Sequence, residues 1–232
     1  RIPMLIIDAP STVSNRLKFN ARAAGILGFS MFGSQRKYAL NDDLSVNIEV
    51  VSDFFDENRD KPFFLFGFTF IVFRDFLLNL EKENIVFENN KGMLIHGGGW
   101  KKLEELAVSP SELKTRIKNC LGISSVFDYY GMVEQTGSIF LECSSGYFHC
   151  SEWSEILVRD PNTLEVVDMG KKGLLQLISL VPHSYPGNSI LTEDLGKIDG
   201  VDDCSCGRRG KYFKVLGRIT NSELRGCSNV IK

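Results

Sequence analysis

The sequence lacks the long apolar run that a membrane-spanning helix requires. Its most apolar stretch, residues 62–73, is closed by Arg74 and Asp75, and a spanning helix needs about 20 apolar residues. We therefore expect no membrane span, and we interpret the stretch as a buried strand that continues into a helix. No signal peptide, twin-arginine segment or lipidation motif opens the chain, which begins with Arg1, and we interpret it as part of a longer protein.

The sequence also has no surplus of basic residues. Its 27 Lys and Arg side chains are balanced by 29 Asp and Glu side chains, which gives a net charge of −2. Domains that bind nucleic acid usually carry a basic face, so this composition argues against nucleic acid as a partner. With 232 residues, 43% of them hydrophobic, the chain can bury a sizeable core in one large domain or two small ones.

Cysteine is scarce, and its grouping indicates metal or thiol chemistry. Six cysteines are too few for a disulfide scaffold, and four lie in "ECSSGYFHC" and "DDCSCGRRG", so we expect a reducing cytoplasm. Cys143, His149, Cys204 and Cys206 match the Cys₃His ligand set of structural zinc, although Cys-x-Cys is tighter than the usual spacing. Cys150 is a competing ligand. The alternative is a group of half-buried thiols without a metal.

The first part of the chain alternates strand-like runs with helical periodicity. The runs "PMLIID", "PFFLFGF" and "GMLIHGGG" are separated by helical segments, which implies an α/β fold with a mostly parallel sheet flanked by helices. One helix is expected around residues 15–24. "SPSEL" is typical of a helix start, with Ser109 as the cap, Pro110 in the first turn and Glu112 three residues after the cap. The phenylalanines of residues 63–76 are more typical of core than of an acyl tunnel.

From residue 139 the pattern changes to that of a β-rich unit. The turn signals "DPNT" and "MGKKG" separate apolar runs, as in antiparallel meanders. We therefore expect an α/β nucleotide-binding layer over residues 1–138. A smaller β-rich subdomain with a cysteine-containing C-terminal hairpin would follow over residues 139–232.

Two loops that follow strand-like runs carry the candidate binding residues. "HGGGW" and "YYGMVEQ" should lie beyond the carboxyl ends of their strands, where ligands of open parallel sheets bind, so we expect them to face one cleft. Consecutive glycines allow a phosphate or planar ligand to approach the backbone. Tyr130 offers a stacking face, and Glu134 offers a carboxylate for a divalent cation. The set suits a nucleotide, with a plain turn and a solvated glutamate as the alternative. For His96 and His183, local hydrogen bonding is favoured over acid–base chemistry.

The order of the motifs resembles that of the adenylate-forming superfamily. After the glycine loop come "YGMVEQ", "DPNTLEVVDMGKKGLLQLISL", "ILTEDLG", "CSCGRRGKYFKVLGR" and "RGCSNV". The series is similar to that of the phenylacetate-CoA ligases, and most similar to the LuxE-type acyl-protein synthetases of bacterial luminescence. The resemblance implies the core of an adenylate-forming enzyme that is truncated at its N-terminus.

The resemblance assigns a role to each matching residue. Asp194 would bind the ribose hydroxyls of ATP, Arg218 would assist it, and Glu134 would be the catalytic carboxylate that holds Mg²⁺. The nucleotide-binding residues implied in this way are Gly97, Gly98, Gly99, Asp128, Tyr129, Tyr130, Gly131, Asp194 and Arg218.

The chain also departs from the pattern of this superfamily. Val133 stands where the family often has a hydroxyl residue, so one expected phosphate contact is absent, and Glu193 stands where the family usually has a glycine. The family's phosphate loop would precede Arg1 and its mobile lysine would follow Lys232. Whether the fragment alone binds ATP or is active therefore stays open.

The implied reaction is activation of a carboxylic acid, a fatty acid above all, by ATP to acyl-AMP. The acyl group would then move to an enzyme cysteine, which we assign to Cys227, whose thiolate Arg225 would favour. The resemblance implies an acyl reductase and an acyl transferase as partners. An acyl- or aryl-CoA ligase and a non-catalytic nucleotide-sensing module are the alternatives. The sequence leaves open the chain length of the acid and the oligomeric state.

Overall fold

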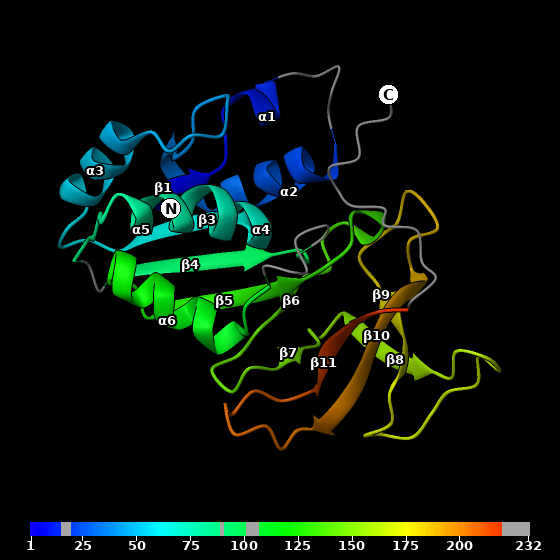
Figure 1. Cartoon of the computed structure of the whole chain (residues 1–232). Helices are drawn as coiled ribbons and strands as arrows, with labels where there is room; N and C mark the ends of the chain where they lie inside the picture. The colour runs from blue at the N-terminus through cyan, green and yellow to red at the C-terminus, as the bar shows by residue number, and fades with distance from the viewer. Residues whose placement is uncertain (15–19, 89–90, 101–106, 220–232) are drawn as a thin grey trace. The chain divides into compact units, whose positions relative to one another are not determined.

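The computed structural model describes residues 1–14, 20–88, 91–100 and 107–219. Their contacts divide the chain between Asp128 and Tyr129 into two compact units, which Figure 1 colours from blue to red along the sequence. The subdomain boundary expected at residue 138 stays a prediction. No helix in the described ranges combines the length and the apolar character needed to cross a bilayer.

A mostly parallel sheet begins in the first unit. In the described residues its order is β2-β1-β3-β4-β5-β6. Strands β2, β1, β3 and β4 pair in parallel, and β6 runs antiparallel to β5. The α/β class expected from the sequence is therefore confirmed. The bounds of the strands are Ile2–Ile7 for β1, Gly33–Tyr38 for β2, Phe63–Phe68 for β3, Gly92–Gly97 for β4, Ser125–Tyr130 for β5 and Phe140–Leu141 for β6.

The helices of the first unit lie between its strands. Of the helix expected around residues 15–24, residues 15–19 lie outside the described residues, and α2 begins at Ala21 and continues to Ser30. Helix α6 begins where "SPSEL" predicts it, because the Ser109 hydroxyl accepts the N–H of Glu112 at 3.2 Å. Gly122, with φ of 70°, ends this helix in the left-handed conformation. The bounds are Ser11–Ser14 for α1, Ala21–Ser30 for α2, Ile48–Glu57 for α3, Thr69–Ile71 for α4, Leu78–Lys82 for α5 and Pro110–Leu121 for α6, with a π-helix, Val72–Leu77, between α4 and α5.

Phenylalanines form much of the core of the first unit. Phe54 and Phe63 meet edge to face at 5.5 Å, and Phe29 stacks on Phe66 at 4.2 Å. These contacts are the preferred arrangements of buried rings. The phenylalanines at 63, 64, 66, 68, 70, 73 and 76 are at most 7% exposed, which confirms that they are core residues.

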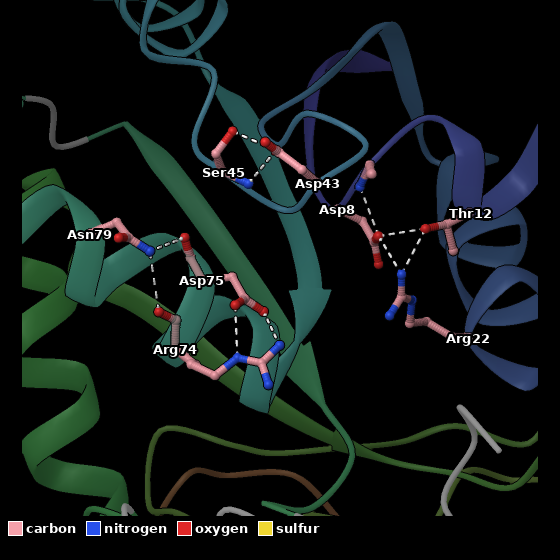
Figure 2. Close-up of polar contacts among 9 residues, drawn as sticks. Asp8, Thr12, Arg22, Asp43, Ser45, Arg74, Asp75 and Asn79 are labelled. Carbon is pink, nitrogen blue, oxygen red and sulfur yellow. Dashed lines mark hydrogen bonds and ion pairs between the residues drawn. The ribbon is translucent and has the colours of Figure 1, made fainter.

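A buried ionic group closes the carboxyl end of β1. Asp8 is fully buried, and its Oδ1 atom accepts hydrogen bonds from Thr12 at 2.7 Å and from Arg22 at 3.0 Å (Figure 2). Burial raises the pKa of Asp8, against the opposing effect of the Arg22 guanidinium. The group therefore ties the carboxyl end of β1 to α1 and to α2.

The second unit contains an antiparallel sheet of order β7-β11-β10-β9-β8 within the described residues. Each neighbouring pair is antiparallel, as the turn signals predict. One face buries a core that includes Phe140, Phe213 and Ile156. The strand bounds are Phe148–His149 for β7, Ser154–Arg159 for β8, Gly173–Ser179 for β9, Ser189–Val201 for β10 and Lys211–Arg218 for β11.

Candidate functional site

The glycine loop of the first unit leaves strand β4 with its backbone exposed. Gly97 ends the strand, and Gly98 follows with φ of 78°, a conformation that favours glycine. A Cβ atom at Gly98 would lie 3.1 Å from the Phe68 ring, so a larger residue would also be crowded. Trp100 packs edge to face on Phe73 at 5.0 Å and anchors the end of the loop. Beyond the buried end of β4, Gly98 and Gly99 are thus exposed, and their main chain is accessible.

A buried, neutral histidine directly precedes this loop in β4. His96 is buried in β4, and its Nδ1 atom lies 2.9 Å from the hydroxyl oxygen of Thr69. Burial lowers the pKa of His96 to about 4, so the imidazole is uncharged near neutral pH. Asp128 lies 3.7 Å from the same nitrogen. The expectation of local hydrogen bonding at His96 is confirmed.

In the second unit, Tyr130, Asp194 and Arg218 form one polar group. The Tyr130 hydroxyl donates to Oδ2 of Asp194 at 2.7 Å, and Nε of Arg218 donates to Oδ1 of the same carboxylate at 3.0 Å. Asp194 and Arg218 are register partners on β10 and β11, which explains why residues far apart in sequence meet. Burial, and then the Asp194 charge, raise the pKa of Tyr130, so its hydroxyl remains a donor.

Tyr130 is held by packing against aromatic rings, and it stands at the end of β5, where the chain reverses direction. Its ring packs at 6.1 Å against both Phe148 and Phe213 in the core of the second unit. Tyr129, its neighbour on β5, pairs with Leu141 on β6. Gly131 follows, where a Cβ atom would approach a backbone oxygen to 3.1 Å. The chain leaves β5 after Tyr130 and returns antiparallel to it in β6.

Glu134 lies in a single 3₁₀ turn, Val133–Gln135, within this reversal. Its side chain is exposed, and no residue in the described part of the chain forms an ion pair or hydrogen bond with its carboxylate. A free, exposed carboxylate fits Mg²⁺, which takes one or two carboxylates together with phosphate oxygens. Gln135, the buried residue that follows Glu134 in the same motif, was not predicted as a functional residue.

The predicted nucleotide-binding residues are distributed over both units. Gly97, Gly98, Gly99 and Asp128 belong to the first unit, and the residues from Tyr129 to Arg218 belong to the second. The convergence of all of them on one nucleotide stays a prediction. Cys227 lies outside the described residues.

The four predicted zinc ligands come together in the second unit. The ligand atoms of Cys143, His149, Cys204 and Cys206 all lie within 4.8 Å of one another. The Cys143 and Cys204 sulfurs are 3.9 Å apart, and the Cys206 sulfur lies 3.5 Å from Nε2 of His149. A tetrahedral site with Zn–S bonds of about 2.3 Å has sulfurs roughly 3.8 Å apart, so these separations suit zinc.

The electrostatics of this cluster also favour a cation. Burial raises the pKa of the Cys143 thiol, but hydrogen bonds from the N–H groups of Tyr147 and Ser145, and from neighbouring thiols, outweigh burial and lower it overall. Burial, and then the nearby Arg208, lower the pKa of His149, which keeps its imidazole neutral. Cys150 is not part of the cluster, and burial raises its pKa to about 12. The lowered pKa favours loss of the Cys143 proton, whereas burial raises the pKa of the Cys206 thiol; a deprotonated thiol and a neutral imidazole are the forms that bind metal.

Comparisons with known proteins place the chain in one family. The family model described as "Acyl-protein synthetase, LuxE" matches residues 1–232. The chain is 25% identical over 193 residues to a long-chain-fatty-acid–luciferin-component ligase of Aliivibrio fischeri, covering 81% of this chain and 50% of that protein. It is 23% identical over 138 residues to the ligase of the same name from Vibrio harveyi, covering 58% of this chain and 35% of that protein.

A solved structure shares the fold. An open conformation of 2-hydroxyisobutyryl-CoA ligase, in complex with 2-HIB-AMP and CoA, matches with a TM-score of 0.67 and 19% identity, over 94% of this chain and 45% of that one. The chain spans half the length or less of these three proteins. Since the family model matches every residue from 1 to 232, the chain belongs to the LuxE family of acyl-protein synthetases.

Proposed function

We propose that the chain is part of an ATP-dependent acyl-protein synthetase that activates a fatty acid and transfers it to one of its own cysteines. The observation that carries this proposal is the family match over residues 1–232. The names of the two curated relatives support a long-chain fatty acid as substrate and ligation as the reaction. The 2-HIB-AMP in the solved ligase supports an adenylate as the intermediate.

The proposed reaction has two steps. A carboxylate oxygen of the fatty acid attacks the α-phosphorus of ATP, the bond to the bridging oxygen breaks, and pyrophosphate leaves. The thiolate of Cys227 then attacks the acyl carbon, the bond to the AMP oxygen breaks, and a thioester remains on the enzyme. Bound Mg²⁺ would neutralise phosphate charge during the first step, with Glu134 as its ligand.

The residues of the chain have separate tasks in this reaction. The exposed backbone of the glycine loop would contact the adenine, and the Asp194 carboxylate would accept hydrogen bonds from the ribose hydroxyls. Tyr130 and Arg218 orient that carboxylate through their hydrogen bonds at 2.7 and 3.0 Å. Positioning of this kind lowers the barrier because the reactants meet already aligned.

We also propose a structural zinc ion held by Cys143, His149, Cys204 and Cys206. The ion would join the turn between β6 and β7 to the connection between β10 and β11. The free thiols in the described residues agree with a reducing cytoplasm as the location of the protein. An acyl reductase and an acyl transferase are the proposed partners.

Pyrophosphate exchange tests the proposal. Protein expressed from the complete coding sequence should catalyse exchange of labelled pyrophosphate into ATP only when a fatty acid is present, and without CoA it should keep a hydroxylamine-labile acyl label. Cys227→Ser should retain exchange and lose the label, because the thiol acts only in the second step. Cys120→Ser is the control, since burial raises the pKa of the Cys120 thiol to about 11 and leaves it unreactive.

The alternatives give different results in the same experiment. A label that Cys227→Ser retains would refute the assignment of Cys227 as the acyl acceptor, whereas an acyl group that passes only to added CoA would indicate an acyl-CoA ligase. The absence of exchange with every acid in a panel of different chain lengths would reject adenylation and favour a non-catalytic nucleotide-binding module.

A further inference from the structure

A fully buried glutamine stands beside the proposed magnesium ligand. Gln135 ends the turn that carries Glu134, and its side chain is 0% exposed, whereas Glu134 faces solvent. Its Nε2 atom donates to the carbonyl oxygen of Gly187 at 2.9 Å and to that of Leu177 at 3.3 Å. The amide therefore fastens the turn both to strand β9 and to the loop that follows this strand.

That loop, residues 180–188, contacts the same turn from another direction. The Tyr185 hydroxyl accepts the N–H of Thr136 at 2.9 Å. The packing is tight, because a Cβ atom at Gly187 would lie 3.0 Å from the backbone oxygen of Glu134 and 2.5 Å from the Tyr185 ring. The loop thus holds the backbone of the turn on either side of the Glu134 side chain, while the Glu134 carboxylate stays exposed.

The glutamine amide is only partly satisfied at this buried position. In the part of the chain that the structure describes, Oε1 of Gln135 is buried without a hydrogen-bond partner. Burial of an unpaired polar atom is unfavourable, and a methionine of similar length would fill the space without it. What glutamine adds is a pair of N–H donors that fix the turn in one orientation.

We infer that Gln135 is a positioning residue, which holds the turn so that the Glu134 carboxylate is presented in one fixed position to the Mg²⁺ of magnesium-ATP. The inference rests on the proposed function. Mg²⁺ demands near-ideal ligand positions, so a carboxylate on a loose turn binds it less well. Tyr185 helps to hold the same turn, because its hydroxyl accepts the hydrogen bond from the N–H of Thr136.

The test compares ATP binding with and without Mg²⁺, measured by calorimetry on protein expressed from the complete coding sequence. In the wild type, Mg²⁺ tightens ATP binding. In Gln135→Met this gain falls by about 10-fold, the smaller end of the usual effect of removing a group that orients a metal ligand. The affinity for ATP without Mg²⁺ is unchanged. Tyr185→Phe removes one hydroxyl from an exposed side chain and lowers the gain by about 3-fold.

Gln176→Met is the matched control. Gln176 lies on β9 next to Leu177, but its amide contacts Arg159 and Ser189 and not the turn. This variant keeps the wild-type gain from Mg²⁺. Thermal unfolding of each variant is measured alongside.

The outcomes separate the inference from the proposed function. If Gln135→Met or Tyr185→Phe lowers the unfolding midpoint but leaves the gain from Mg²⁺ unchanged, the role is only structural and the inference is overturned. If Gln135→Met does not fold, Tyr185→Phe decides alone. A wild type that shows no Mg²⁺-dependent ATP binding overturns the proposed function itself, and the inference with it.

Discussion

At the scale of single residues, the hydrogen bond between Tyr130 and Asp194 links stability to the proposed nucleotide site. Tyr130→Phe keeps the ring among Phe148 and Phe213 but removes the donor to the carboxylate. Hydrogen bonds to charged groups contribute about 1.5–3 kcal/mol, so the free energy of unfolding should fall by about that amount, as denaturant titration measures. The affinity for ATP should fall as well, because Asp194 loses part of its orientation.

Tyr147→Phe is the control for this change. The Tyr147 ring packs on Tyr212 at 4.9 Å, and its hydroxyl forms no hydrogen bond within the described residues. This variant should keep both the stability and the ATP affinity of the wild type. Equal effects of the two substitutions would contradict the role assigned to the Tyr130 hydroxyl.

The burial of His96 makes the protein sensitive to acid. Burial lowers its pKa from 6.5 to about 4. Between these pH values the unfolded chain binds a proton at His96, whereas the folded chain does not. The contribution of neutral His96 to the free energy of unfolding is therefore fully present above pH 6.5. It is lost as the pH falls toward 4, by about 3 kcal/mol in total. Urea titrations at several pH values should show a flatter dependence for His96→Gln than for the wild type.

His183→Gln gives the comparison for this prediction. His183 is exposed in the 180–188 loop, so its substitution should leave the acid dependence as it is in the wild type. An identical slope for His96→Gln and the wild type between pH 6.5 and 4 would mean that another group causes the loss.

At the scale of helices and strands, the sequence predicts elements whose burial or caps leave a local signal. The start of α6 follows from Ser109, Pro110 and Glu112, and strand β3 follows from its apolar run. Strand β2 was not predicted. Its residues, "GSQRKY", are mostly polar because it is an edge strand, and an edge strand with one paired side needs no apolar run.

The candidate site shows the same limit of prediction. The motifs indicate Tyr130, Asp194 and Arg218 as neighbours of one ligand. They do not indicate that the tyrosine hydroxyl bonds the aspartate, because Tyr130 ends β5 in one sheet, Asp194 lies on β10 in the other, and 64 residues separate them in the sequence. The contacts of Gln135 depend on a loop about fifty residues later in the chain, which no local pattern encodes.

At the scale of the whole molecule, the second unit has a small core and two loops that the proposed zinc ion would join. Cys143 lies between β6 and β7, whereas Cys204 and Cys206 lie between β10 and β11. Cys143 and Cys204 are therefore 61 residues apart in the sequence. A metal that binds such distant ligands binds only the folded chain, and its binding free energy therefore adds to the stability of the fold.

This linkage predicts how zinc and stability change together. Protein purified without chelators should contain about one zinc ion per chain, and removal of the ion should lower the unfolding midpoint of the second unit. Cys206→Ser should lose the metal and show the same lower midpoint with or without chelator. Cys150→Ser should keep the metal, because Cys150 is outside the cluster. Metal analysis and calorimetric unfolding measure both quantities, and metal-free protein with an unchanged midpoint would leave the four side chains as a packed thiol cluster.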